Sequence, residues 1–115
     1  MRNIVDTAVV LLCTIWVSPL AASDTLLKTQ DIRVRDPFIY ADTETKTYYL
    51  YAQSENRAGS GLKGVEVYAS KDLVNWLPPQ TVMSLPKDAD VTMVWAPEVH
   101  EYKGAYYLLV TLTSH

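Results

Sequence analysis

The stretch DPFIYADTETKTYYLY, residues 36–51, decides the fold class of this 115-residue chain. Its first part, Phe38–Tyr40, is aromatic and β-branched, and Thr47–Tyr51 is again rich in residues that strands favour. The polar segment 42–46 between them is typical of a turn. The stretch therefore predicts a β-hairpin.

A similar pattern returns in APEVHEYKGAYYLL, residues 96–109. Pro37 and Pro97 are 60 residues apart, and Tyr48 and Tyr106 are 58 residues apart. A repeat of this length with about four strands to a period is typical of β-propeller blades, although the familiar scaffold propellers repeat at about 40–50 residues. The sequence therefore predicts an all-β chain that holds one blade and the first part of a second.

Further strands are expected after the first hairpin. Val65–Ala69 alternates apolar and polar residues, as a half-buried strand does, and 55–64 is expected to be a loop. Prolines flank Thr81–Ser84, which favours a strand at the edge of a sheet. Trp95–Glu101 and Ala105–Thr113 are predicted to form a second hairpin. No amphipathic helix is expected.

Composition and charge exclude several classes of protein. The chain is 49% hydrophobic and 20% charged, with a formal net charge of -3. These values exclude a disordered acidic tail and a collagen-like repeat, and they argue against a nucleic-acid partner, which would require a basic surface.

The first residues resemble a secretory signal peptide. An uncharged stretch from Thr7 to Ser23 follows a weakly positive start, and PLAAS at 19–23 supplies the small residues of a cleavage site. We predict a signal peptide at residues 1–22, which places the protein in the periplasm or outside the cell, with no membrane contact after cleavage. An uncleaved anchor is the alternative, but the segment is shorter than the roughly 20 apolar residues that a membrane span needs. The only cysteine, Cys13, lies within the signal, so the mature chain has no disulfide.

Asp36 is the candidate catalytic residue. Because Pro37 donates no hydrogen bond to a ladder, the end of its strand stays open. In a propeller this end faces the central channel, where a base would meet its substrate. Arg33 and Arg35 are expected to favour the ionised carboxylate. In the other interpretation, Asp-Pro only begins a strand.

Three motifs carry a family resemblance: RDPF at 35–38, SKDLVNW at 70–76 and WAPEVH at 95–100. Together and in this order, they resemble glycoside hydrolase family 43. The resemblance covers residues 31–114. It implies a five-bladed β-propeller of which this chain holds blade one and the start of blade two, so that residues 23–115 form a truncated amino-terminal part of a catalytic domain.

The resemblance also implies an activity. Family members hydrolyse arabinose- or xylose-containing glycans with inversion at the anomeric carbon, and Asp36 matches the general base. The general acid, a glutamate, belongs to the fourth blade, and an aspartate that tunes it belongs to the third. Because this chain holds the base alone, it is expected to be inactive by itself. Because it spans only about one and a half blades, it is also expected to fold poorly. No cofactor is required, a structural calcium ion is compatible with a longer protein, and the oligomeric state stays open.

Other residues have two interpretations each. Trp95 is expected either to stack on a sugar ring or to pack between the blades. Glu98 is a second candidate for binding substrate, and the alternative is that it holds a neighbouring loop by hydrogen bonds. His100 lacks the clustered partners of a metal site, and Trp76 is expected in the core. Besides a glycosidase, the pattern allows a non-catalytic carbohydrate-binding propeller and a purely structural propeller.

Overall fold

The computed structural model describes residues 25–54 and 63–114. The predicted signal peptide, residues 1–22, lies outside the described residues, as does most of the predicted loop at 55–64. Within the described ranges, no helix has the length and apolar character to cross a membrane.

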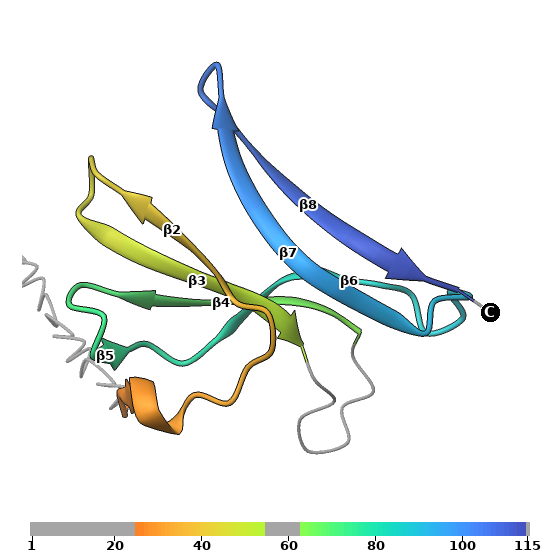
Figure 1. The fold of residues 1–115 in the computed structure, drawn as a ribbon, viewed down its shortest axis with the longest axis horizontal. Helices are drawn as coiled ribbons and strands as arrows, with labels where there is room; N and C mark the ends of the chain where they lie inside the picture. Colours follow the sequence, from red (N-terminus) through yellow and green to blue (C-terminus); the bar gives the residue numbers. More distant parts are fainter. Residues whose placement is uncertain (1–24, 55–62, 115) are drawn as a thin grey trace, which may run out of the picture.

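The first sheet is antiparallel and has six strands, in the order β1-β5-β4-β3-β2 with β6 also paired to β4 (Figure 1). Its strands are β1 (Leu27–Lys28), β2 (Phe38–Asp42), β3 (Thr47–Ser54), β4 (Gly64–Ser70), β5 (Asn75–Trp76) and β6 (Gln80–Ser84). A single turn of 3-10 helix, Thr29–Asp31, follows β1. Strands β7 (Met93–Tyr102) and β8 (Ala105–Thr113) form a second, two-stranded sheet. The expectation of an all-β chain without an amphipathic helix holds for this part of the chain.

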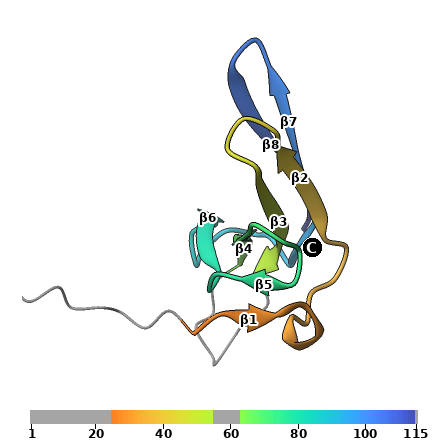
Figure 2. The same ribbon diagram turned by 90° about the vertical axis from the view of Figure 1, so that its left-hand side faces the viewer.

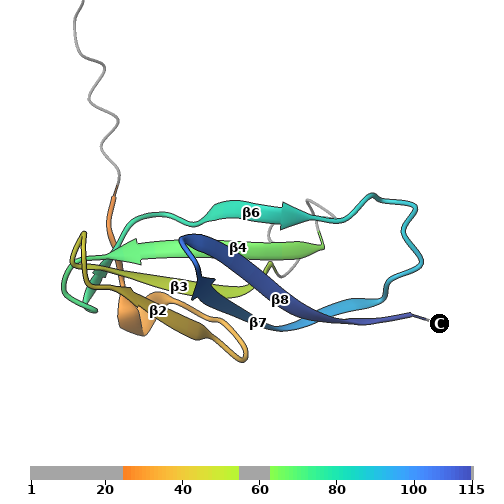
Figure 3. The same cartoon turned by 90° about the horizontal axis from the view of Figure 1, so that it is seen from above.

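Strands β5 and β6 together flank one side of β4. The partner of Trp76 in β5 is Ser70 at one end of β4, whereas β6 pairs with Gly64–Val67 at the other end. The prolines at 78–79 lie between them, where a missing N–H does no harm because the ladder is interrupted. The predicted edge strand at 81–84 is thus confirmed as β6, and Figure 3 shows β6, β4, β3 and β2 side by side in that order.

The register of the two hairpins confirms the internal repeat. Phe38 pairs with Tyr51 in the first hairpin, and Glu98 pairs with Leu109 in the second. The turn of the first hairpin holds the four residues 43–46, while that of the second holds only 103–104. This difference of two residues accounts for the two repeat spacings, 60 before the turn and 58 after it.

A small core lies between the first sheet and the segment that precedes β2. Leu50, Ala52, Tyr68 and Trp76 are buried, and Ile32 and Val34 pack against them. Trp76 is 1% exposed, and its Nε1–H donates a hydrogen bond of 2.9 Å to Thr29 Oγ1. The prediction that Trp76 belongs to the core is confirmed, and the same contacts anchor the segment that leads to Asp36.

The second hairpin lies against the first sheet. Strand β7 contacts β2, β3 and β4, and Figure 2 shows the β7–β8 hairpin beside β2 and β3. Buried Val94 and Val99 belong to this hairpin. The first residue of β2, Phe38, is placed beside His100, which lies near the carboxyl end of β7.

Candidate active site

Asp36 lies directly before β2, in a bend between the core-anchored segment and the strand. Its φ of 47° lies in the left-handed region, which is uncommon for residues other than glycine and is best tolerated by aspartate and asparagine. Such conformations cost about 1–3 kcal/mol and cluster at functional sites. The bend at Asp36 therefore departs from the extended backbone that a residue before proline ordinarily adopts.

The equivalent position in the second repeat has the same backbone feature. Ala96, which precedes Pro97, has a φ of 38°, and the ladder shifts register between Trp95 and Glu98. A β-bulge of this kind bends the strand and redirects side chains, often beside active sites. Both repeats thus bend immediately before their proline, and Trp95 is the positional equivalent of Arg35.

Arg35 touches two of the candidate residues. Its Nε lies 3.7 Å from Oδ2 of Asp36, and its Cζ lies 4.9 Å from the centroid of the Trp95 ring. The side chains of Arg35 and Asp36 are 61% and 54% exposed, so their ion pair contributes only about 0–1 kcal/mol to stability. Of the two arginines expected near Asp36, Arg35 forms the ion pair, and no described contact joins Arg33 to the carboxylate.

Glu98 and His100 form a pair on β7. Nε2 of His100 lies 3.0 Å from Oε2 of Glu98, and both side chains are about half exposed. The His100 ring also lies 5.8 Å from the Phe38 ring, tilted by 46°. The structure therefore gives Glu98 a partner that sequence reasoning missed, although the spacing of two residues along one strand puts both side chains on the same face.

Three side-chain contacts join strand β2 and the segment just before it to the second hairpin. Arg35 meets Trp95, Phe38 meets His100, and Tyr40 meets Tyr106 edge-to-face at 5.6 Å. Aromatic pairs with this geometry contribute about 0.5–1.5 kcal/mol beyond the area they bury. The repeat could have suggested the first contact, because Arg35 and Trp95 are 60 residues apart.

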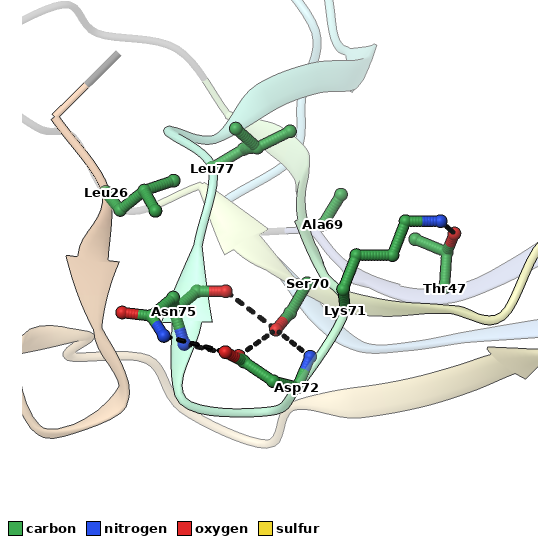
Figure 4. A pocket seen from close by; sticks show the side chains of 8 residues that line it. All are labelled: Leu26, Thr47, Ala69, Ser70, Lys71, Asp72, Asn75 and Leu77. Atoms are coloured by element: carbon green, nitrogen blue, oxygen red, sulfur yellow. Dashed lines mark hydrogen bonds between the residues drawn. The ribbon is translucent and has the colours of Figure 1, made fainter. Parts of the chain in front are cut away.

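A cavity of about 310 Å³ lies at the opposite end of the first sheet (Figure 4). It is lined by Leu26, Thr47, Ala69, Ser70, Lys71, Asp72, Asn75 and Leu77. Thr47 pairs with Asp42 at the far end of β2 from Asp36, so the cavity is remote from the candidate base. Its polar wall is a self-contained turn, since Asp72 accepts hydrogen bonds from the N–H groups of Val74 and Asn75.

Within the described residues, no group of three or more His, Cys, Asp or Glu side chains is placed to hold a metal ion.

The chain resembles known proteins in both sequence and structure. The family described as "Glycosyl hydrolases family 43" matches residues 30–115. The chain is 26% identical to an extracellular exo-α-(1→5)-L-arabinofuranosidase of Cellvibrio japonicus, over 86% of this chain and 28% of that protein. It also resembles the crystal structure of an endo-arabinase from Bacteroides thetaiotaomicron, with a TM-score of 0.59 and 34% identity over 76% of this chain and 29% of that one.

These matches settle fold and ancestry. The chain spans less than a third of the length of both relatives. The order of its strands, the register of its two hairpins and the structural match confirm the predicted all-β propeller architecture. Since the family match covers most of the chain, the protein belongs to glycosyl hydrolase family 43.

Proposed function

We propose that the protein is a glycoside hydrolase that cleaves arabinose-containing polysaccharides, with Asp36 as the general base. The observation that carries the proposal is the exposed Asp36 carboxylate, held before β2 in a left-handed conformation and paired with Arg35 beside Trp95. An arabinofuranosidase and an endo-arabinase among its relatives support arabinose over xylose as the sugar.

The proposed mechanism inverts the anomeric carbon. Asp36 takes a proton from a water molecule, the water oxygen bonds to the anomeric carbon, and the glycosidic bond breaks as its oxygen receives a proton from a carboxylic acid. In inverting enzymes the two carboxyl groups stand about 6.5–9.5 Å apart, which leaves room for the water. The acid must therefore lie on the opposite side of the glycosidic bond from Asp36 and the attacking water.

Glu98 is not proposed as that acid. It matches the acidic position of the WAPEVH motif, which is not the proton donor in the family that this chain resembles, and its Oε2 is engaged by His100. The acid and the aspartate that tunes it are proposed to come from sequence beyond residue 115. On this proposal, residues 23–115 are inactive by themselves.

Trp95 and Glu98 are proposed to bind the sugar. Trp95 is half-buried and offers an aromatic surface on which sugar C–H groups can stack, while Glu98 can accept hydrogen bonds from sugar hydroxyls. The predicted signal peptide and the extracellular relative both support action outside the cytoplasm.

The test replaces the base in an active framework. Residues 30–114 are placed in the matching segment of the Bacteroides thetaiotaomicron endo-arabinase, and Asp36→Asn is introduced into this hybrid. Because asparagine keeps the shape but takes no proton, kcat on arabino-oligosaccharides should fall by about 10²–10⁴, with KM little changed. Asp31→Asn, at an exposed position in the 3-10 helix, is the matched control and should keep its activity.

A rate retained by Asp36→Asn would contradict the assignment. A hybrid that binds arabino-oligosaccharides but does not cleave them would favour the second candidate, a non-catalytic carbohydrate-binding propeller. This alternative is kept because only one of the three carboxylates that the mechanism needs is assigned within the chain.

A further inference from the structure

We propose that Arg35 is a positioning residue that fixes the Asp36 carboxylate and the Trp95 ring relative to each other. The inference rests on the proposed function, because it assigns Arg35 a part in that same site. Its basis is that the Arg35 guanidinium contacts two residues at once: Asp36, which precedes β2 of the first sheet, and Trp95, which lies in β7 of the second sheet.

The two contacts use different parts of the guanidinium. The Nε edge faces Oδ2 of Asp36 at 3.7 Å, and Cζ lies over the Trp95 ring at 4.9 Å from its centroid. A planar guanidinium can pair through its edge and stack through its face at the same time, which the compact ammonium of lysine cannot do. The arrangement therefore needs arginine specifically.

The contact with Asp36 leaves the carboxylate available as a base. At 3.7 Å the separation is longer than a direct hydrogen bond, and no described hydrogen bond occupies Oδ1. Arg35 thus directs the carboxylate by charge without taking up the oxygen that would receive the proton from water.

The backbone on each side supports the same conclusion. Arg35 directly precedes Asp36, with its φ of 47°, and Trp95 directly precedes Ala96, with its φ of 38°. Equivalent bends in the two repeats therefore bring equivalent side chains into contact between the sheets. Because its side chain is 61% exposed, Arg35 adds little to core packing. Its role is therefore to fix the positions of Asp36 and Trp95.

A competing role makes the opposite prediction. If Arg35 merely covered the face of Trp95 in the absence of sugar, the substrate would have to displace it, and removing the guanidinium would tighten binding. Positioning predicts weaker binding and slower turnover.

The experiment compares three variants in the arabinase hybrid. Arg35→Gln should lower kcat about tenfold, because the base loses its alignment, and raise KM about threefold, because Trp95 loses its stacked partner. Arg35→Lys keeps the positive charge and should restore most of kcat but not KM. Arg33→Gln, at an exposed neighbouring arginine without a described ion pair to Asp36, should change neither value.

A KM lowered by Arg35→Gln, or kinetics unchanged in that variant, would overturn the proposal. Failure of the proposed function looks different, because the hybrid with the unaltered residues would then not cleave arabinan at all. In that case a second measurement decides the contact itself.

This second measurement uses the full 115-residue chain with ¹⁵N-labelled tryptophan. The indole Nε1–H resonance of Trp95, assigned with Trp95→Phe, should shift in Arg35→Gln and stay in place in Arg33→Gln. The resonance of buried Trp76 is the internal control, because it reports that the core of the first sheet is formed. A Trp95 resonance that Arg35→Gln leaves unmoved would refute the contact.

Discussion

At the scale of single residues, the candidate site depends on two bends that precede prolines. Asp36 and Ala96 both adopt positive φ values, although a residue that precedes proline ordinarily takes an extended conformation. The repeat matches Asp36-Pro37 with Ala96-Pro97 in sequence, and Asp36 and Ala96 also share a positive φ in the structure. The repeat is therefore a repeat of geometry, with a carboxylate at one bend and a small residue at the other.

A substitution at Trp95 distinguishes its two interpretations, stacking on a sugar ring and packing between the blades. If its ring stacks on sugar, Trp95→Ala in the arabinase hybrid should raise KM about tenfold while the melting temperature changes little. The measurement is a Michaelis–Menten series on arabino-oligosaccharides beside a thermal melt.

The matched control is Trp76→Ala, since Trp76 is buried in the core. That variant should lower the melting temperature strongly, because truncating a buried tryptophan costs about 3–5 kcal/mol. A Trp95→Ala variant that loses stability and keeps its KM would assign Trp95 to packing between the blades.

At the scale of elements, the turn between β4 and β5 is the most strongly hydrogen-bonded connection described. The Asp72 carboxylate accepts the backbone N–H of Asn75 at 2.7 Å and that of Val74 at 2.9 Å, and Asn75 Nδ2 donates a third bond at 2.7 Å. These bonds hold the pKa of Asp72 far below its ordinary value, and the bond from the Asn75 backbone N–H has the largest effect. The SKDLVNW motif therefore has a structural role at this turn.

The turn should lose protection in acid. Because the folded-state pKa of Asp72 lies below that of the unfolded chain, its stabilisation is complete above the ordinary value of 3.8 and is lost as pH falls from there towards the folded-state pKa. Hydrogen exchange of the segment 70–76, followed by mass spectrometry between pH 7 and pH 3, measures this. The extra protection of the unaltered chain over Asp72→Asn should be largest near neutral pH and should shrink below about pH 4.

Asp31→Asn serves as the control here as well, because the structure describes no side-chain hydrogen bond to Asp31. Its exchange in segment 70–76 should match that of the unaltered chain at every pH. A constant difference between the chain and Asp72→Asn across the whole range would show that the charge of Asp72 does not support the turn.

Strand β8 exposes large apolar side chains and is the second element that leads to a test. It pairs with β7 on one side, and large apolar residues on both of its faces are exposed. Those more than a third exposed are Tyr106, Tyr107, Leu109 and Leu112. An apolar strand with a free edge is a template for pairing with another chain.

Leu109→Lys should therefore reduce self-association of the chain, because a charged side chain on an edge strand opposes pairing between molecules. Sedimentation velocity over a range of protein concentrations measures the effect. Val74→Lys is the control, since Val74 is 53% exposed and Leu109 is 54% exposed, but Val74 lies in a turn. Equal effects of the two substitutions would mean that general solubility, rather than the edge, is responsible.

At the scale of the whole molecule, the described core is small. Its buried hydrophobic cluster in the first sheet consists of Leu50, Ala52, Tyr68 and Trp76. A propeller blade buries its faces against neighbouring blades, and the second sheet contributes only two strands here. We therefore expect the chain by itself to unfold with low cooperativity.

The 115-residue chain should accordingly unfold over a broad temperature range, whereas the arabinase hybrid should unfold sharply. Circular dichroism at a strand-sensitive wavelength, recorded during heating, gives both curves. A single sharp transition in the chain by itself would contradict this expectation, because it would show that one sheet and a hairpin suffice for a cooperative fold.

Local sequence was sufficient for the strands with clear patterns. The apolar and β-branched runs at 38–40, 65–69 and 105–113 all form strands, and the polar segment 42–46 holds the first hairpin's turn. The two-residue strands β1 and β5 were not foreseen, because two residues show no periodicity and pair only where tertiary contacts bring them together. The position of Asp36 before β2 and its pairing with a nearby arginine follow from local sequence, whereas the second contact of Arg35, with Trp95, does not.

The sequence by itself thus determined the repeat, the two hairpins and the residue proposed as the base, because strand periodicity, turn residues and proline act over a few neighbouring positions. Only the tertiary structure decided that Arg35 contacts both Asp36 and Trp95, and that Phe38 meets His100. The contacts of Arg35 with Trp95 and of Phe38 with His100 join residues about 60 positions apart in the sequence. Their distances depend on how one sheet lies against the other, which no local pattern specifies.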